Sequence, residues 1–126
     1  MGKEKKLQAY DLGVSAEEIV ANHYIQRGYT VLERRWMMKK TEIDLIVQKE
    51  DTIVIVEVKA RSGKDEDAIS TVTSDKRHRM VKAADAYISS LKGTYEYRFD
   101  IATVTGNKSD YVVECYEDAF VGADIF

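Results

Sequence analysis

The chain has 126 residues, of which 44% are hydrophobic and 33% are charged, a balance typical of a globular domain and not of a disordered segment. Its 19 basic and 22 acidic residues give a formal net charge of −3, which excludes a uniformly basic nucleic-acid coat. The single cysteine excludes an internal disulfide and a cysteine-rich zinc site. The charged first residues lead into no apolar run of signal-peptide or membrane length, so we expect a cytoplasmic protein with no membrane partner.

Hydrophobic spacing and turn residues predict two helices and five strands in one domain over residues 1–126, with the core at about 12–120 and an acidic C-terminal tail. In chain order, the expected elements are a helix from Ser15 to Gly28, strands at 29–36, 42–48 and 52–59, a helix at 74–92, and strands at 95–104 and 111–115. Ser15 and Glu18 form a capping-box pattern, and Gly28 and Gly93 are placed to end the two helices in a left-handed conformation. Residues 63–71 are expected to form a loop. This order predicts an α/β or α+β sandwich with a mixed sheet.

The second and third predicted strands are expected to form a hairpin with its turn at Glu50 and Asp51. A two-residue turn there gives the hairpin two chemically different faces. The register puts Ile43 opposite Val58, Leu45 opposite Val56 and Val47 opposite Val54 on an apolar face, and Glu42 opposite Lys59, Asp44 opposite Glu57 and Ile46 opposite Ile55 on the other. Directly opposed residues have Cβ atoms only about 4.5–5.5 Å apart. Asp44 and Glu57 are therefore predicted to form a carboxylate pair beside Lys59.

Opposed carboxylates destabilise a sheet unless their charge is compensated. A magnesium ion compensates it through hard oxygen ligands, and it often binds only one or two carboxylates besides water and substrate phosphate. A neighbouring lysine could then orient a water molecule or offset charge on a phosphate. The alternative is that these charged residues form the solvated face of a half-exposed sheet. Ile46 and Ile55 on the same face favour a covered site, because buried charges are rarely kept without a partner.

Asp44, followed after twelve residues by Glu57-Val58-Lys59 in an apolar strand, resembles the PD-(D/E)xK nuclease pattern. That superfamily includes restriction endonucleases and archaeal Holliday-junction resolvases. A closer resemblance, to the small bacterial YraN family, covers the chain from about Leu12 to Phe120. The features that carry it are Leu12-Gly13, Glu17, Gly28-Tyr29, Glu33-Arg34, Trp36, Glu42-Ile43-Asp44-Leu45-Ile46, Val56-Glu57-Val58-Lys59-Ala60-Arg61, Lys76 to Arg79, Ala84 to Tyr87, and Arg98-Phe99-Asp100.

The resemblance implies a restriction-endonuclease-like core, with a mixed sheet flanked by helices. It also implies a divalent-metal-dependent endonuclease acting on DNA, with branched or damaged DNA as candidate substrates. By resemblance, Asp44, Glu57 and the backbone carbonyl of Val58 match the ligands of magnesium or manganese. Lys59 matches the catalytic lysine, and Glu17 matches a helix acid that comes close to the metal site.

Charge is segregated along the chain, which bears on the partner. The segment from Arg27 to Lys40 contains five basic residues and one acidic residue, and the segment from Lys76 to Lys82 contains four basic residues and no acidic one. From Asn107 onward there are one basic and five acidic residues. Basic clusters beside a metal site would hold a phosphate backbone, although a solvated helix start explains Lys76 to Lys82 equally well. The predicted nucleic-acid-binding residues are Arg34, Arg35, Lys39, Lys40, Arg61, Lys76, Arg77, Arg79 and Lys82.

Two further hypotheses stay open at this point. The first is a non-catalytic module that binds nucleic acid or a protein on a nuclease fold. Arg35 and Thr41 motivate it, because the family resemblance leads us to expect asparagine and glycine there. The second is a purely structural role, with affinity for neither metal nor nucleic acid. A chain of this length has a radius of gyration of about 14 Å and covers little more than one duplex turn, which makes a homodimer a candidate assembly.

Overall fold

The computed structural model describes residues 9–61, 72–107 and 110–120, with side chains for 16–60, 72–106 and 111–119. The predicted loop at 63–71 and the last residues of the predicted acidic tail lie outside this part. The elements are α1 (Ala9–Ile25), β1 (Thr30–Met38), β2 (Thr41–Lys49), β3 (Thr52–Arg61), α2 (Ser74–Ser89), β4 (Glu96–Asn107) and β5 (Asp110–Phe120). The two predicted helices and five predicted strands are therefore all present, in the predicted order. None of the described helices is both long and apolar enough to cross a membrane.

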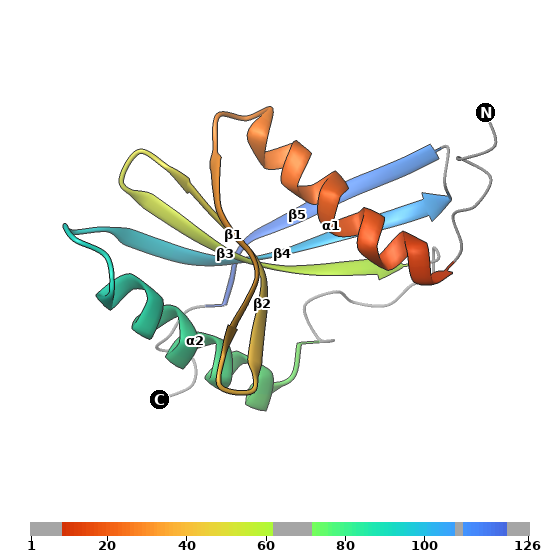
Figure 1. The fold of residues 1–126 in the computed structure, drawn as a ribbon. Helices are drawn as coiled ribbons and strands as arrows, with labels where there is room; N and C mark the ends of the chain where they lie inside the picture. Colours follow the sequence, from red (N-terminus) through yellow and green to blue (C-terminus); the bar gives the residue numbers. More distant parts are fainter. Residues whose placement is uncertain (1–8, 62–71, 108–109, 121–126) are drawn as a thin grey trace.

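One five-stranded sheet, in the order β1-β2-β3-β4-β5, forms the centre of the fold. Neighbouring strands are antiparallel except for β3 and β4, which are parallel. Their parallel pairing needs a crossover, and α2 lies within it. Figure 1 views the sheet nearly edge-on, with α1 on one side and α2 on the other. This mixed sheet with flanking helices is compatible with the restriction-endonuclease-like core that was predicted.

Each face of the sheet is covered by one helix, and the side-chain alternation of β3 shows how. Val54 and Val56 belong to the apolar cluster that contains residues of α1, whereas Ile53 and Ile55 belong to the cluster that contains residues of α2. All four are fully buried. A side chain of this kind contributes roughly 1.5–3 kcal/mol when it is fully buried. The central hairpin is therefore anchored from both sides, and it positions the charged residues at its far end.

The helix ends differ in part from the prediction. The first helix begins at Ala9, so Ser15 lies inside it and the capping-box pattern there does not mark its start. Gly28 adopts a φ of +94°, the left-handed conformation predicted for the end of this helix. The second helix is capped by Thr73, whose side chain accepts a hydrogen bond from the Lys76 backbone N–H at 3.2 Å. It ends at Ser89, three residues before the predicted end.

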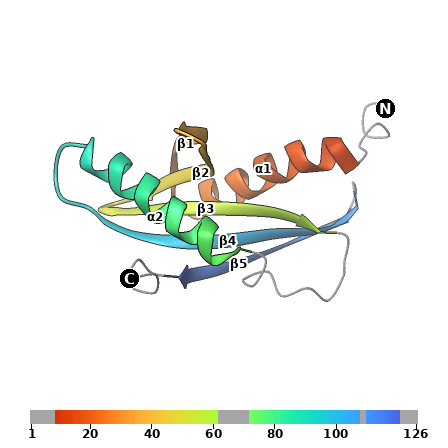
Figure 2. The ribbon, with the colours of Figure 1, turned by 90° about the horizontal axis from the view of Figure 1, so that it is seen from below.

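The hairpin of β2 and β3 has the predicted register over half of its length. Leu45 pairs with Val56 and Val47 with Val54, and Glu50 adopts a φ of +55° in the turn. The ladder then ends at Leu45, so the predicted direct pairing of Asp44 with Glu57 does not form, nor do the two pairings beyond it. The β1–β2 ladder continues to its last pair, Met38 and Thr41. The part of the β1–β2 hairpin beyond Leu45 thus separates from β3 and bends away from the sheet (Figures 1 and 2).

The bend coincides with a break in the backbone of β1. Arg35 has a φ of +52°, and the ladder skips Arg35 and its counterpart Asp44. Beyond this point Ile43 joins the cluster under α2, although the predicted alternation placed it on the face of Leu45, under α1. Ile43 pairs with Trp36, which packs against the same cluster, so both strands of the hairpin change face at the skipped positions Arg35 and Asp44.

Candidate functional site

Asp44 lies where β2 separates from β3, and its side chain takes over the missing main-chain pairing. Its Oδ2 accepts a hydrogen bond from the backbone N–H of Val58 at 2.8 Å. In a strand, the N–H and C=O of one residue point toward the same neighbour. The Val58 carbonyl therefore faces the same side, the side that β2 has left. One carboxylate and one backbone carbonyl are thereby brought to the end of the sheet.

Glu57 is the second carboxylate of the site, and it is only 4% exposed. Its Oε2 lies 3.6 Å from Lys59 Nζ and 3.4 Å from Lys76 Nζ. Its Oε1 is buried and has no hydrogen-bond partner in the described part of the chain. A buried acceptor without a partner carries a desolvation cost, which a bound ion would offset.

These oxygens fit a hard divalent cation. Asp44 and Glu57 supply carboxylates, Val58 supplies a carbonyl, and Mg²⁺ and Mn²⁺ prefer such donors. Within the described ranges, no three His, Cys, Asp or Glu side chains come close enough together to hold a metal ion. The donor set is therefore a pair of carboxylates with a carbonyl, which suits magnesium, since it keeps several water ligands.

Electrostatics at this end of the sheet favour a bound cation. Burial, followed by the charge of Glu57, raises the pKa of Asp44 to about 7, although the hydrogen bond from Val58 opposes the shift. Burial also raises the pKa of Glu17, against the opposing effect of Arg35. The charges of Glu42 and Glu57 act on Glu17 in the same direction as burial. The negative charges of these carboxylates thus disfavour ionisation of one another, and a bound divalent ion would offset this repulsion.

A hollow of about 140 Å³ opens beside Asp44, between α1 and the β1–β2 hairpin. Its lining residues are Glu17, Glu18, Arg34, Arg35, Asp44 and Leu45. The Arg35 side chain lies on this side, where its Nε is 3.3 Å from Glu42 Oε2 and 3.8 Å from Glu17 Oε1. The helix acid Glu17 thus lines the same hollow as Asp44.

The predicted nucleic-acid-binding residues fall into three groups. Arg34 pairs with Glu18 at 2.8 Å, and Arg35 pairs with two acids, so both are engaged within the protein. Lys76 contacts Glu57, and the Arg77 Nε donates a hydrogen bond to the Val72 carbonyl. Lys39, Lys40, Arg79 and Lys82 are exposed and, unlike Arg34 and Arg35, form no ion pair with the described residues. Arg61 ends β3, and its side chain lies outside the described residues.

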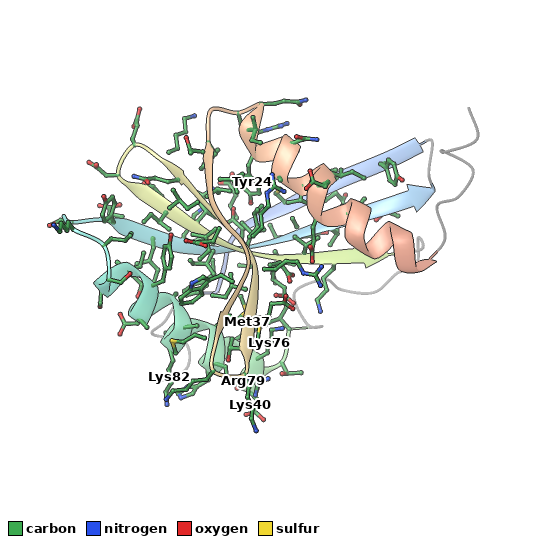
Figure 3. All side chains as sticks on the ribbon, viewed as in Figure 1. Tyr24, Met37, Lys40, Lys76, Arg79 and Lys82 are labelled. Carbon is green, nitrogen blue, oxygen red and sulfur yellow. The ribbon has the colours of Figure 1, made fainter. Side chains whose placement is uncertain are left out.

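Lys76 is the site residue whose position the sequence did not reveal. The sequence placed it in a basic cluster that contacts phosphate, whereas the fold places its Nζ on the same Glu57 oxygen as Lys59. Figure 3 shows Lys76 at the end of α2 that lies near the β1–β2 hairpin. No local pattern signals this contact, because it joins β3 to a helix across the undescribed residues 62–71.

A family comparison bears on this arrangement of side chains. The model of the uncharacterised protein family UPF0102 matches residues 16–104. The chain belongs to this family. UPF0102 relatives include UPF0102 protein FP2501 of Flavobacterium psychrophilum, which is 39% identical over 87% of this chain and 93% of the relative. UPF0102 protein CE1920 of Corynebacterium efficiens is 39% identical over 94% of this chain and 98% of the relative. A UPF0102 protein of Flavobacterium johnsoniae is 35% identical over 87% and 94%.

The match confirms the resemblance drawn from the sequence, since the YraN family is UPF0102. The region shared with the UPF0102 family runs from Ala16 in α1 to Val104 in β4. It therefore contains all the residues of the candidate site, Glu17, Asp44, Glu57, Val58, Lys59 and Lys76.

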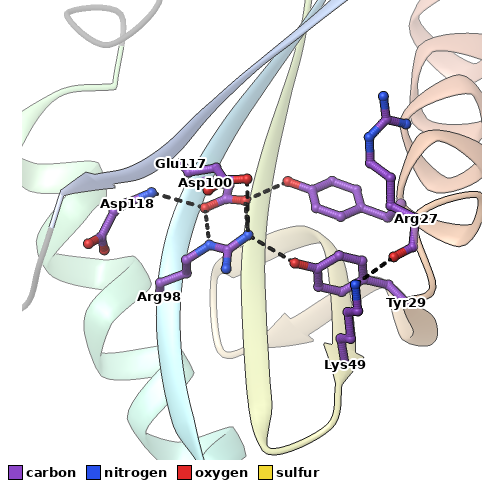
Figure 4. A network of polar contacts seen from close by, with 8 residues as sticks. Arg27, Tyr29, Lys49, Arg98, Asp100, Glu117 and Asp118 are labelled. Carbon is purple, nitrogen blue, oxygen red and sulfur yellow. Dashed lines mark hydrogen bonds and ion pairs between the residues drawn. The ribbon is translucent and has the colours of Figure 1, made fainter.

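A second polar cluster in this UPF0102 protein is fully paired and is therefore structural. Asp100 is fully buried, and its Oδ2 accepts hydrogen bonds from the Tyr24 hydroxyl at 2.6 Å and from Arg98 at 3.2 Å. Its Oδ1 accepts from Arg98 Nε at 2.9 Å and from the Asp118 backbone N–H at 3.1 Å (Figure 4). Arg98 also donates to the Tyr29 hydroxyl at 3.2 Å. The cluster ties α1 and the start of β1 to β4 and β5, and it leaves no lone pair of Asp100 open for a ligand.

The raised pKa of Asp44 predicts a pH-dependent stability for this UPF0102 protein. An ordinary aspartate releases its proton near pH 3.8, whereas folded Asp44 holds it until about pH 7. The unfolded chain therefore loses the proton first, and Asp44 lowers the free energy of unfolding progressively as the pH rises from about 4 to about 7. Asp44→Asn keeps an oxygen that can accept the Val58 N–H but has no charge. The variant should gain stability relative to wild type as the pH increases.

Urea denaturation in EDTA, at about pH 5 and about pH 8, measures this difference. Asp85→Asn, at an exposed position on α2, is the matched control and should give the same difference from wild type at both values. If Asp44→Asn also differs from wild type by the same amount at both pH values, Asp44 has an ordinary pKa, and the effect of burial and of Glu57 on it is wrong.

Proposed function

We propose that this protein is a divalent-metal-dependent endonuclease that hydrolyses DNA phosphodiesters, with branched or damaged DNA as its substrates. One observation carries the proposal. A buried Glu57 oxygen, without a partner among the described residues, lies at the end of the sheet that also holds the Asp44 carboxylate and Lys59. Carboxylates for a metal and a neighbouring ammonium group are the groups that in-line hydrolysis of a phosphodiester requires. The reducing cytoplasm, where DNA is found in bacteria, is the compartment that this activity implies.

Asp44, Glu57 and the Val58 carbonyl would hold Mg²⁺ or Mn²⁺, which when bound would neutralise charge on the phosphate and act as a Lewis acid. The Nζ of Lys59 would orient the attacking water and offset negative charge on the phosphate. Hydrolysis forms a bond between the water oxygen and phosphorus, and it breaks the bond from phosphorus to a sugar oxygen, which takes up a proton. Glu17 would act as a positioning residue beside Asp44. The basic side chains Lys39, Lys40, Arg79 and Lys82 would contact the phosphate backbone.

A cleavage panel tests this function. The substrates are single-stranded, duplex, flap and four-way-junction DNA, with RNA for comparison, each incubated with Mg²⁺, Mn²⁺ or EDTA. We expect cutting that needs the metal and falls to background in Asp44→Ala and Asp44→Asn. Asp85→Asn, which removes an exposed carboxylate on α2, should cut like wild type. No cutting of any substrate by wild type with either metal would overturn the nuclease proposal.

A second candidate is a non-catalytic binding module on the same fold. The observation in its favour is that two lysines, Lys59 and Lys76, already compensate the charge of Glu57 without a cation. This hypothesis predicts DNA binding that is the same in EDTA and in Mg²⁺, and that is unchanged by Asp44→Asn. Binding of this kind, together with no cleavage, would favour the module over the enzyme.

A further inference from the structure

The tip of the β1–β2 hairpin combines an exposed apolar side chain with exposed cations. Beyond Arg35 and Asp44 the two strands pair only with each other, so the tip projects from the sheet (Figures 1 and 2). Met37 is 55% exposed there. Lys39 and Lys40 form the turn and are exposed as well.

Strand alternation explains why Met37 faces solvent. Trp36 and Met38 on either side of it pack into the cluster under α2, and the Trp36 ring meets the Tyr87 ring edge-on at 5.1 Å. Met37 must therefore turn away from α2. The same contacts fix the hairpin against the helix, so the tip is held in place by its other face and Met37 is not needed for packing.

Two further exposed cations lie on α2, which packs against the face of the hairpin opposite to Met37. They are Arg79 and Lys82, and in the view of Figure 3 both lie toward the same end of the molecule as Lys40. Asp75 is the only acid between the helix cap and Lys82. The residue opposite Met37 is Glu42, whose carboxylate lies 3.3 Å from Arg35 Nε. Arg35 offsets this charge, so Lys39 and Lys40 leave the tip itself positively charged.

We infer that the hairpin tip is a wedge that docks on DNA, with Met37 inserted into the base stack and Lys39 and Lys40 on the phosphates. Apolar side chains, methionine among them, kink DNA in this way by partly unstacking one base step. An unbranched methionine adapts to such a gap more readily than a β-branched residue. Lysine, in contrast, is depleted at protein–protein interfaces, so the same surface fits a protein partner poorly. The inference rests on the proposed function, because both place DNA along the hairpin.

A binding experiment in EDTA tests the wedge without any cleavage. The probe is a short DNA duplex with a nick, where stacking is weakest, and with 2-aminopurine beside the nick to report unstacking. We expect wild type to bind and to raise the fluorescence. Met37→Ala should bind about 5- to 10-fold more weakly, which corresponds to about 1–1.4 kcal/mol. It should also lose most of the fluorescence rise, because the inserted side chain is what unstacks the base step.

Val112→Ala is the matched control, since Val112 is also an apolar strand residue at 55% exposure, on the opposite edge of the sheet. It should bind and unstack like wild type. Lys39→Gln with Lys40→Gln should weaken binding to all DNA and make the affinity less dependent on salt. Urea denaturation of each variant confirms that the fold is intact.

The outcomes separate this inference from the proposed function. If Met37→Ala binds and unstacks like wild type, the wedge is wrong while the nuclease proposal stands. If unstacking depends on Met37 but the cleavage panel shows no cutting, the nuclease is wrong and the wedge stands. If wild type binds none of the DNA probes in EDTA, the wedge is overturned, and the cleavage panel with metal decides the nuclease proposal separately.

Discussion

Asp100→Ala should lower the free energy of unfolding by about 3–5 kcal/mol, the usual cost of removing one partner of a buried ion pair. Asp100 accepts four hydrogen bonds, from Tyr24, Arg98 and the Asp118 backbone. Without it, the Arg98 guanidinium loses its main partner in a site where that side chain is only 22% exposed. The Tyr24 hydroxyl is also left without its acceptor. Domains of this size have only about 5–15 kcal/mol of stability, so the variant would be close to unfolding.

Urea denaturation, followed by far-UV circular dichroism, measures the loss. Tyr24→Phe removes one hydrogen bond and keeps the ring, so it should cost only about 1–2 kcal/mol. Glu117→Gln is the control at the edge of the cluster, because Glu117 lies 3.7 Å from Arg98 and is 69% exposed. It should leave the midpoint unchanged. An Asp100→Ala protein with a wild-type midpoint would contradict the view that this cluster holds α1 to the sheet.

The elements that the sequence predicted well depend on local signals. The turn at Glu50 and Asp51, with alternating apolar residues on both sides, was enough to fix the register of Leu45 with Val56. Gly28 was recognised because a left-handed residue after a helix is a local requirement that glycine meets. In both cases neighbouring residues decide the conformation, and the sequence contains those neighbours.

What the sequence did not predict depends on residues that are far apart or on a conformation that the residue type disfavours. Nothing in an arginine predicts a φ of +52°, yet Arg35 adopts it where the hairpin bends. Beyond the bend, Asp44 no longer pairs with Glu57. Lys76 reaches Glu57 from another element, and Tyr24 reaches Asp100 across 76 positions of sequence. The candidate ligands could thus be named from their pattern, but their geometry could not.

The two lysines on Glu57 provide the sharpest division of roles within the site. Lys59 Nζ and Lys76 Nζ lie 3.6 and 3.4 Å from the same Glu57 oxygen, and their side chains are 34% and 31% exposed. If Lys59 orients water and offsets charge on the reacting phosphate, Lys59→Gln should lower the cleavage rate at saturating DNA by about 10²–10³-fold, the usual loss on removal of one such group. Lys76→Gln is its matched control, because it removes an equivalent charge from the same oxygen. It should lower the rate at saturating DNA far less than Lys59→Gln does, because Lys76 is given no contact with the reacting phosphate.

Metal affinity, measured by titration calorimetry with Mn²⁺ and no DNA, should move the other way in both variants. Each lysine competes with a cation for Glu57, so Lys59→Gln and Lys76→Gln should each bind Mn²⁺ more tightly than wild type. Tighter metal binding together with lost turnover would assign Lys59 to the chemical step, because a variant that merely disordered the site would lose both. Cleavage by Lys59→Gln at the wild-type rate would make the proposed role of Lys59 wrong. Unchanged Mn²⁺ affinity in both variants would show that Glu57 is not a metal ligand. If Glu57 were a ligand, loss of a competing ammonium group would strengthen its binding to the metal.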